Sequence, residues 1–292
     1  MTQPIDCPLL TPFDGSFDLS SVPTSPPSDA PGKKECKELL AKEVEKLDDL
    51  QRVLYAKDHH SILCVFQAMD AAGKDSTIRA VFKGVNPAGF QVHSFKRPST
   101  KELDHDFLWR SAKALPERGR IGVFNRSYYE EVLVVKVHPG ILDSQKLPDR
   151  LGLDELFQNR YESIRAHEKH LARNGVVILK FWLNVSRDEQ ARRFLSRLDD
   201  PRKNWKFEPG DVKERGYWDK YMDAYEGAIQ ETSREHAPWY AVPADDKSYM
   251  RWQVARVLRK TLEQLDLAYP EVDPAEREQF DGFHKQLSAE LE

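Results

Sequence analysis

Five short apolar runs separated by polar stretches constrain the fold of this chain more than any other feature. Apolar runs of this length are typical of strands that are buried on both faces of a parallel sheet. The polar stretch after each run has the spacing of a crossover helix. The pattern predicts a three-layer α/β fold, with helices on both faces of one five-stranded parallel sheet. The predicted strands are residues 61–66, 90–95, 121–124, 176–185 and 239–242.

The segments outside the predicted sheet divide the chain into an arm and one domain. Residues 1–32 contain seven of the 18 prolines and neither Lys nor Arg, so we expect an extended or partly disordered arm. In residues 33–57, apolar side chains recur every three or four positions, which predicts an amphipathic helix. A single domain is expected over residues 33–292, with a second long helix over residues 246–265.

Composition excludes several classes of protein. The longest apolar run contains Lys180 and falls short of the roughly 20 residues that a membrane-spanning helix needs. The first basic residue, Lys33, comes too late for a secretory signal. Three cysteines without CxxC spacing argue against a disulfide framework or a zinc site. We therefore expect a cytoplasmic protein without a membrane partner.

Positive charge is concentrated in two stretches of a chain whose net charge is -4. Residues 73–126 contain eleven Lys or Arg against five Asp or Glu, and residues 187–206 contain seven against four. Such blocks are common as solvated helix faces, and they also occur where a protein binds a polyanion. The basic residues cluster around one loop and not along a helix, so sequence-specific nucleic-acid binding is not expected.

The loop after the first predicted strand has the composition of a phosphate-binding loop. The stretch AMDAAGKDST, residues 68–77, combines small residues, a lysine and the start of a predicted helix. In such loops the backbone N–H groups and the helix dipole converge on an anion, and the lysine adds a positive charge. The strict pattern G-x-x-x-x-G-K-[ST] fails at Ala68 and Asp75. A chance turn of small residues is therefore the alternative.

Two charged side chains near this loop are candidates for catalysis. Asp70 offers hard oxygen ligands for Mg²⁺ in a loop that lacks the usual hydroxyl; capping the loop is its alternative role. Arg126 follows the third predicted strand and would emerge beside the loop, because parallel sheets bind ligands beyond the carboxyl ends of their strands. Its planar fork suits phosphate oxygens. A surface ion pair with Glu130 or Glu131 is the alternative for Arg126.

Residues 187–216 have the features of a lid. A helix is predicted over residues 186–198, and the following stretch breaks its periodicity at Pro201, Pro209 and Gly210. Arginines on a closing lid neutralise charge in phosphoryl transfer and exclude water. Acidic neighbours are present, so we expect no more than half of the lid cations to contact substrate. The cations are Arg187, Arg192, Arg193, Arg197, Arg202, Lys203 and Lys206.

Five ordered blocks of sequence resemble the family-2 polyphosphate kinases over residues 33–265. The resemblance implies a P-loop kinase-like fold similar to that of thymidylate kinase, with a helical lid over residues 187–216. It also implies reversible transfer of the terminal phosphoryl group between inorganic polyphosphate and a nucleotide, with Mg²⁺ as cofactor and Mn²⁺ as a substitute. Relatives are commonly dimers or tetramers, so a homo-oligomer is expected. The blocks are MDAAGKDS (69–76), FKRPSTKELDHDFLWR (95–110), FNRSYYEEVLVVKVHP (124–139), DDPRKNWK (199–206) and APWYAVPADDK (237–247).

The resemblance also implies roles for individual residues. Asp70, Lys74 and Arg126 would be catalytic, with Asp70 as the metal ligand. Glu130 and Asn125 would border the nucleotide, and Arg110 is a further candidate for facing it. Two departures from the family pattern are Ala68, where Gly is usual, and Asn125, where many relatives have Asp. The residues expected to bind phosphate or polyphosphate are Ala71, Ala72, Gly73, Asp75, Ser76, Arg187, Arg193, Arg197 and Lys206.

The acceptor is predicted from a separate motif. The motif Tyr-Tyr-Glu-Glu at residues 128–131 resembles a subgroup that accepts both nucleoside mono- and diphosphates, with Glu130 at the deciding position. AMP and ADP are therefore the expected acceptors, ATP a product, and guanine nucleotides are further candidates. Two rival functions fit the residues: a nucleoside monophosphate kinase that uses ATP as donor, and a non-catalytic module that binds polyanions.

Overall fold

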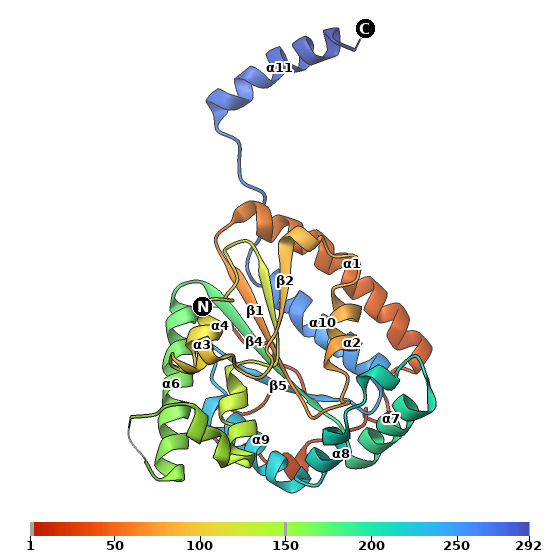
Figure 1. The fold of residues 1–292 in the computed structure, drawn as a ribbon. Helices are drawn as coiled ribbons and strands as arrows, with labels where there is room; N and C mark the ends of the chain where they lie inside the picture. Colours follow the sequence, from red (N-terminus) through yellow and green to blue (C-terminus); the bar gives the residue numbers. More distant parts are fainter. Residues whose placement is uncertain (1–2, 149–150, 292) are drawn as a thin grey trace.

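A parallel sheet forms the centre of the computed structural model, which describes residues 3–148 and 151–291. The five strands lie in the order β2-β3-β1-β4-β5 (Figure 1). Because β3 and β4 flank β1, the carboxyl ends of these strands form the crevice where such a sheet binds ligands. All five predicted strands are confirmed. They are β1 (Ser61–Gln67), β2 (Phe90–Ser94), β3 (Ile121–Asn125), β4 (Val176–Asn184) and β5 (Trp239–Pro243).

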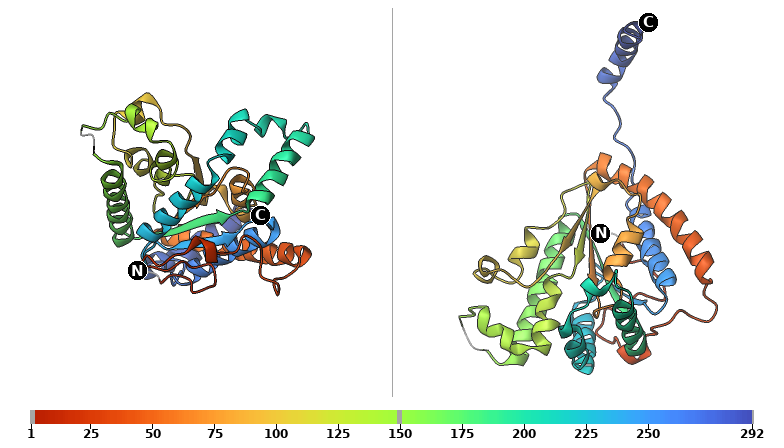
Figure 2. Two further views of the ribbon diagram at one scale, coloured as in Figure 1. Left: turned by 90° about the horizontal axis from the view of Figure 1, so that it is seen from below. Right: turned by 45° about the vertical axis from the view of Figure 1, so that its right-hand side comes forward.

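Helices cover both faces of the sheet (Figures 1 and 2). On one face α1 packs along α10, which also contacts α2. On the other face α6 packs against β4 and α9, and α9 contacts α5. The helices predicted over residues 33–57 and 246–265 are confirmed as α1 and α10. The bounds of these helices are α1 (Lys33–Lys57), α2 (Lys74–Val81), α5 (Val134–Val137), α6 (Leu153–Arg173), α9 (Trp218–Thr232) and α10 (Lys247–Glu263).

The predicted lid consists of two helices joined by a short turn. Ser186 caps the first helix, α7 (Arg187–Asp199), by accepting a hydrogen bond from the backbone N–H of Glu189. The turn η5 (Asn204–Lys206) leads to α8 (Pro209–Arg215). Pro201 follows α7, and Pro209 and Gly210 begin α8, so these residues interrupt the helical periodicity between the two helices. The remaining short elements are η1 (Leu19–Ser21), η2 (Pro87–Gly89), α3 (Thr100–Leu103), α4 (Trp109–Ala112), η3 (Tyr128–Glu131) and η4 (Pro139–Ser144).

Burial differs between the strands of the sheet. All seven residues of β1 are buried, as a central strand requires. β2 lies at one edge and leaves much of its length exposed, with Val92 44% exposed. The similar apolar runs therefore predicted both strands, but not their different positions in the sheet, which tertiary packing decides.

The N-terminal segment lies along the free edge of β5. Leu10 forms an antiparallel bridge with Tyr240, and the backbone N–H of Ala241 donates to the carbonyl of Leu9 at 2.8 Å. Ile5, Leu9 and Phe17 are buried in the same core as the strands. An uncovered edge strand offers unpaired backbone groups to other chains. The proline-rich segment thus covers one of the two edges of the sheet.

The C-terminal helix α11 (Pro274–Ala289) extends away from the rest of the protein (Figure 1). None of its residues is buried. Within the described residues, no helix combines the length and the apolar character that crossing a membrane requires.

Candidate functional site

The loop of residues 68–73, here called the phosphate loop, connects β1 to α2 in an unusual backbone conformation. Ala71 and Gly73 have φ values of 61° and 112°, in the region that side chains disfavour. At Gly73 an added Cβ would also lie 3.3 Å from the terminal carbon of Met250 on α10. The backbone conformation therefore favours glycine at this position, and a larger residue would also need the end of the Met250 side chain to shift. The loop ends where α2 begins, so the N-terminus of α2 points into the site.

Lys74 is the first residue of α2 and turns back over the phosphate loop. Its Nζ atom donates a hydrogen bond to the carbonyl of Ala68 at 2.6 Å. Burial, together with the nearby charge of Arg126, lowers the pKa of Lys74, while Asp70 and Glu130 oppose that change. The lysine therefore lies within the electrostatic reach of the other two predicted catalytic residues.

Arg126 lies between two carboxylates at the end of β3. Its Nη2 atom is 2.9 Å from Oδ1 of Asp70, and its Nη1 atom is 3.4 Å from Oε2 of Glu130. The charge of Glu130 is the main reason that the pKa of Arg126 is raised. Burial raises the pKa of Glu130, and the charges of Arg126 and Lys74 oppose that rise. The structure thus brings Asp70, Lys74, Arg126 and Glu130 together.

A cavity opens beside these residues, and residues of the predicted lid form part of its lining. Asp70, Arg126 and Glu130 line it together with Gln190, Asp211, Glu214 and Arg215 from the lid and Tyr221 and Tyr225 from α9. Glu214 accepts hydrogen bonds from Tyr221 at 2.7 Å and is 2.8 Å from Nε2 of His138. These contacts tie α8 to the body of the protein. The lid carboxylates were not among the predicted site residues, because only cations of the lid were expected to bind phosphate.

The four lid cations expected to bind phosphate have different surroundings. Among the described residues that line the cavity, none is Arg187, Arg193, Arg197 or Lys206. Arg187 is exposed. Arg197 lies 3.4 Å from Asp211, and the ammonium of Lys206 lies 4.9 Å from the ring centre of Trp205.

Arg193 is buried and holds backbone carbonyls on two loops. It donates to Ala72 at 2.5 Å in the phosphate loop and to Ala244 at 2.5 Å after β5. The neighbouring Gln190 donates to the carbonyl of Asp70 at 2.9 Å. Helix α7 is therefore attached to the phosphate loop through its first two turns.

The remaining predicted residues lie around the rim of the site. The amide of Asn125 donates to Oδ1 of Asp75 at 2.5 Å. An aspartate at position 125 would instead place a second negative charge beside Asp75. The hydroxyl of Ser76 donates to the carbonyl of Gly73 at 3.0 Å. Arg110 donates to the carbonyl of Lys96 at 2.8 Å and stacks on Phe95.

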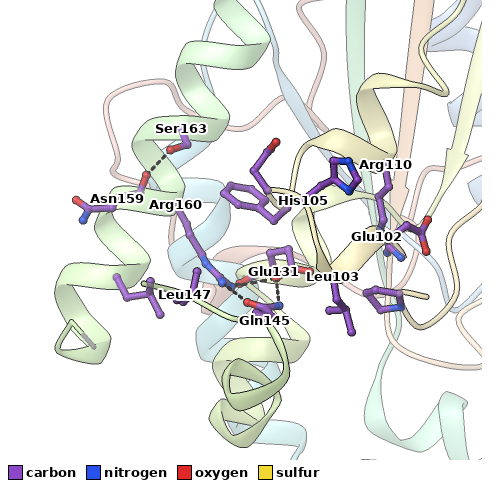
Figure 3. A pocket seen from close by; sticks show the side chains of 14 residues that line it. Glu102, Leu103, His105, Arg110, Glu131, Gln145, Leu147, Asn159, Arg160 and Ser163 are labelled. Atoms are coloured by element: carbon purple, nitrogen blue, oxygen red, sulfur yellow. Dashed lines mark hydrogen bonds and ion pairs between the residues drawn. The ribbon is translucent and has the colours of Figure 1, made fainter. Parts of the chain in front are cut away.

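A second cavity, of about 230 Å³, lies between α3, α4 and α6 (Figure 3). Arg110, Phe107 and the buried Arg160 line it, and the guanidinium of Arg160 lies 5.5 Å from the ring centre of Phe107. Arg160 donates to Glu131, which follows Glu130 of the first cavity, at 3.1 Å. The two cavities therefore lie on either side of η3. Arg160 stands among apolar residues on the packed face of α6, and a charge in such a place is the signal that could have found it.

Two cations at the start of α10 also lie near the phosphate loop. The pKa of Lys247 is lowered by burial and by the charges of Arg193 and Arg251, and that of Arg251 by burial and by Arg79 and Arg193. Cations that depress one another's pKa create a positive potential. These residues lie far from residue 74 in the sequence, so no local pattern predicted them.

The donor set at Asp70 fits a Mg²⁺ ion that is held mainly by a phosphorylated ligand. Within residues 3–148 and 151–291, no three His, Cys, Asp or Glu side chains are grouped to hold a metal ion. Mg²⁺ commonly binds through one or two carboxylates, water and phosphate oxygens. The side chain of Asp70 is 36% exposed and lines the first cavity, so its second oxygen is accessible from there.

Comparison with known proteins places this geometry in a family. The model of the family Polyphosphate kinase 2 (PPK2) matches residues 31–270. The chain is 55% identical over 271 residues to the ADP-polyphosphate phosphotransferase of Rhodopseudomonas palustris, covering 92% of this chain and 94% of that protein. It is 46% identical over 263 residues to the AMP/ADP-polyphosphate phosphotransferase of Meiothermus ruber, covering 90% and 94%.

A solved structure agrees with the sequence comparisons. The crystal structure of Polyphosphate Kinase 2 from Arthrobacter aurescens TC1 has a TM-score of 0.83 and 40% sequence identity to this chain. It covers 91% of this chain, which in turn covers 93% of that chain. The family resemblance and the P-loop kinase-like fold expected from the sequence are confirmed. This chain belongs to the polyphosphate kinase 2 family.

Proposed function

We propose that the protein transfers the terminal phosphoryl group of inorganic polyphosphate to AMP and ADP, reversibly and with Mg²⁺. The observation that carries the proposal is Arg126, which lies between Asp70 and Glu130 in a cavity beside the phosphate loop. Two relatives, an ADP-polyphosphate and an AMP/ADP-polyphosphate phosphotransferase, support these acceptors.

The residues around the cavity provide positioning and charge neutralisation. The backbone N–H groups of the phosphate loop and the ammonium of Lys74 would hold the terminal phosphates of the donor. Arg126 would contact both the transferred group and the acceptor phosphate. The attacking phosphate oxygen is already ionised near neutral pH, so alignment and charge stabilisation are sufficient and no strong base is needed.

Asp70 would hold Mg²⁺, or Mn²⁺ in its place, together with phosphate oxygens of the substrates. The bound ion would neutralise charge on the transferred phosphoryl group. Arg126 fixes one oxygen of Asp70 at 2.9 Å, which leaves the other for the ion. Gln190 holds the backbone of the same residue, so the carboxylate is positioned from two sides.

The second cavity is the place we assign to the nucleoside of the acceptor. It is lined by aromatic rings and polar side chains of the kinds that hold a base and a sugar. The rings of Phe107 and His105 offer stacking surfaces, and Arg110 and Asn159 offer polar groups for AMP, ADP or guanine nucleotides. Glu131 lines this cavity and directly follows Glu130, which pairs with Arg126, so we place the acceptor phosphates on that side.

The positive potential at the start of α10 favours a long polyanion as donor. Lys247 and Arg251 lie within electrostatic reach of Arg193, which holds the phosphate loop, and the lid adds further cations. A nucleoside triphosphate needs only a short basic site, whereas a phosphate chain can contact cations beyond the loop. We therefore assign polyphosphate, and not ATP, to the donor side.

Phosphorus NMR of the purified protein with Mg²⁺ tests the proposal. Polyphosphate is offered with AMP and with ADP in separate samples, and ATP with AMP is a third sample. New ADP and ATP signals in the polyphosphate samples are expected. Transfer only from ATP would establish a nucleoside monophosphate kinase instead. Polyphosphate binding without transfer, retained in an Asp70→Asn variant, would establish a binding module.

A further inference from the structure

A buried ion pair lies behind the turn that carries Arg126 and has no part in the chemistry proposed above. Lys180, in the middle of β4, and Glu168, on α6, have side chains 0% and 1% exposed, with Nζ and Oε2 2.7 Å apart. Burying two charges is costly, and an apolar pair of similar size is often equally stable. Stability alone is therefore a weak reason for this pair to exist.

Two tyrosine hydroxyls complete the hydrogen bonding of the pair. Oε1 of Glu168 accepts from Tyr128 at 2.9 Å and from Tyr129 at 2.8 Å. The ammonium of Lys180 also donates to the hydroxyl of Tyr129 at 2.9 Å and to the carbonyl of Thr232 at 2.8 Å. All three of its protons are thus used. We call Glu168, Lys180 and the two tyrosines the buried anchor.

The tyrosines lie two and three residues after Arg126, whose backbone is strained. Arg126 has a φ of 64°, which a non-glycine residue keeps only where its surroundings hold it. The N–H of Arg126 donates to the carbonyl of Phe66 at 3.1 Å, and the hydroxyl of Ser127 accepts from the N–H of Tyr129 at 3.1 Å. These bonds fix the start of the turn. The buried anchor fixes the next two side chains.

Helix α6 also holds the other end of this turn. Arg160, with a side chain 4% exposed, donates to the carbonyl of Glu131 at 2.7 Å and to its carboxylate at 3.1 Å. Arg160 and Glu168 lie eight residues, or about two helical turns, apart on the same helix. Helix α6 therefore forms hydrogen bonds with both ends of η3. Glu130, which pairs with Arg126, lies between the two attachment points.

We propose that the buried anchor is a positioning device that holds Arg126 and Glu130 in their reactive places. The inference rests on the proposed function, because it assigns these two residues to the phosphoryl transfer. The four residues of the anchor touch neither substrate; they act through η3. A displacement of about 1 Å at a reacting group can cost about 10²-fold in rate, so loss of the anchor should reduce turnover.

The double variant Tyr128→Phe/Tyr129→Phe removes both hydroxyls and leaves the rings in place. We expect kcat for polyphosphate-dependent phosphorylation of ADP to fall about 10- to 100-fold, with KM for polyphosphate changed less than about twofold. The matched control is Tyr240→Phe, which removes another buried hydroxyl, one that accepts from the N–H of Ile5 at 2.8 Å. The control should retain kcat within about twofold. An unchanged kcat in the double variant overturns the proposal.

Amide hydrogen exchange over residues 125–132 supplies a readout that does not need activity. We expect at least about tenfold faster exchange of this segment in the double variant than in the wild type or Tyr240→Phe. Glu168→Gln is the second variant: it keeps an acceptor for the hydroxyls but not the charge, so its exchange and kcat should lie between those of the wild type and the double variant. Unchanged exchange in both variants overturns the proposal.

The two readouts separate this inference from the proposed function. A wild-type protein without polyphosphate-dependent transfer would reject the proposed function, whatever the exchange data show. A wild type that transfers phosphate while the variants lose neither exchange protection nor kcat would reject only the positioning role.

Discussion

The Nη2 atom of Arg126 lies 2.9 Å from Oδ1 of Asp70, so one arginine orients the carboxylate that we propose as the metal ligand. The same guanidinium reaches Glu130 through Nη1. An arginine beside two carboxylates keeps its proton, and the direction of its pKa change agrees with this. Replacing Arg126 would therefore remove the proposed phosphate contact and leave the carboxylates of Asp70 and Glu130 without this partner.

The variant Arg126→Lys should lose about 10²- to 10³-fold in kcat, the range seen when one preorganised stabilising donor is removed. A lysine keeps the charge but lacks the fork that reaches both carboxylates and a phosphate. Steady-state kinetics with polyphosphate and ADP measure the loss. The control is Arg52→Met on the exposed face of α1, whose kcat should equal that of the wild type. Near-normal turnover of Arg126→Lys would remove Arg126 from its assigned role.

Removing divalent cations should abolish transfer, and adding Mg²⁺ or Mn²⁺ should restore it. Asp70→Asn keeps the shape of the side chain but loses the charge that would hold the ion. We expect this variant to need at least about tenfold more Mg²⁺ for half-maximal activity than the wild type. A titration of activity against Mg²⁺ after chelator treatment measures the change. An unaltered Mg²⁺ requirement would mean that Asp70 is not a metal ligand.

Glu130→Gln should shift the preference between the two acceptors toward ADP. Glu130 neutralises part of the charge of Arg126, and ADP carries one more negative charge than AMP. Removing the carboxylate leaves the cavity more positive, so the ratio of kcat/KM for AMP to that for ADP should fall several-fold. Parallel kinetics with both nucleotides give the ratio, and Glu162→Gln on the exposed face of α6 is the control. A ratio that stays constant argues against Glu130 as the deciding position.

The pH dependence of stability should reveal the buried charge of Lys180. Burial lowers its pKa from 10.5 to about 8, so between these two values the unfolded chain binds more protons and stability rises with pH. The comparison is the variant Glu168→Leu/Lys180→Met, which replaces the ion pair with two apolar side chains. Between about pH 8 and pH 10, the free energy of unfolding of the wild type should rise by about 2 kcal/mol relative to that of the variant. Urea unfolding at both pH values measures this. A constant difference would show that Lys180 does not titrate there.

Deleting residues 1–24 should destabilise the protein by several kcal/mol. Three buried apolar side chains, Ile5, Leu9 and Phe17, would be lost, each worth about 1.5–3 kcal/mol. The uncovered edge of β5 should also promote aggregation, visible by light scattering. Deleting residues 273–292 is the matched control, because α11 has no buried residue and its loss should leave urea unfolding unchanged. Equal stability of the two truncated chains would contradict the role assigned to the arm.

The strands and the phosphate loop could be predicted from the sequence because their signals are local. Five apolar runs and one small-residue loop with Lys74 give the sheet and the donor side of the site directly. The edge position of β2 could not be predicted, since an apolar run does not record which strands lie beside it. Glu214 and Lys247 were missed for a similar reason: their place in the site depends on how α8 and α10 pack, and not on their neighbours in sequence.

Charged residues within apolar patterns are a sequence signal that could have predicted two further residues. Lys180 interrupts the apolar run of β4, and Arg160 stands among the residues of a packed helix face. A charge at such a position must find partners inside the protein. Both residues are attached to η3, Lys180 through the hydroxyl of Tyr129 and Arg160 through Glu131. An ionisable residue within an apolar pattern therefore points to a buried network, although the sequence does not name its partners.

The N-terminal arm that covers β5 can dock only late in the synthesis of the chain. The hydrogen bond between Ile5 and Tyr240 joins residues 235 positions apart. The ribosome releases the N-terminal residues first, yet their docking edge emerges only after most of the chain has been made. The arm is therefore made before β5, and it can pair with that edge only after residues 239–243 have left the ribosome.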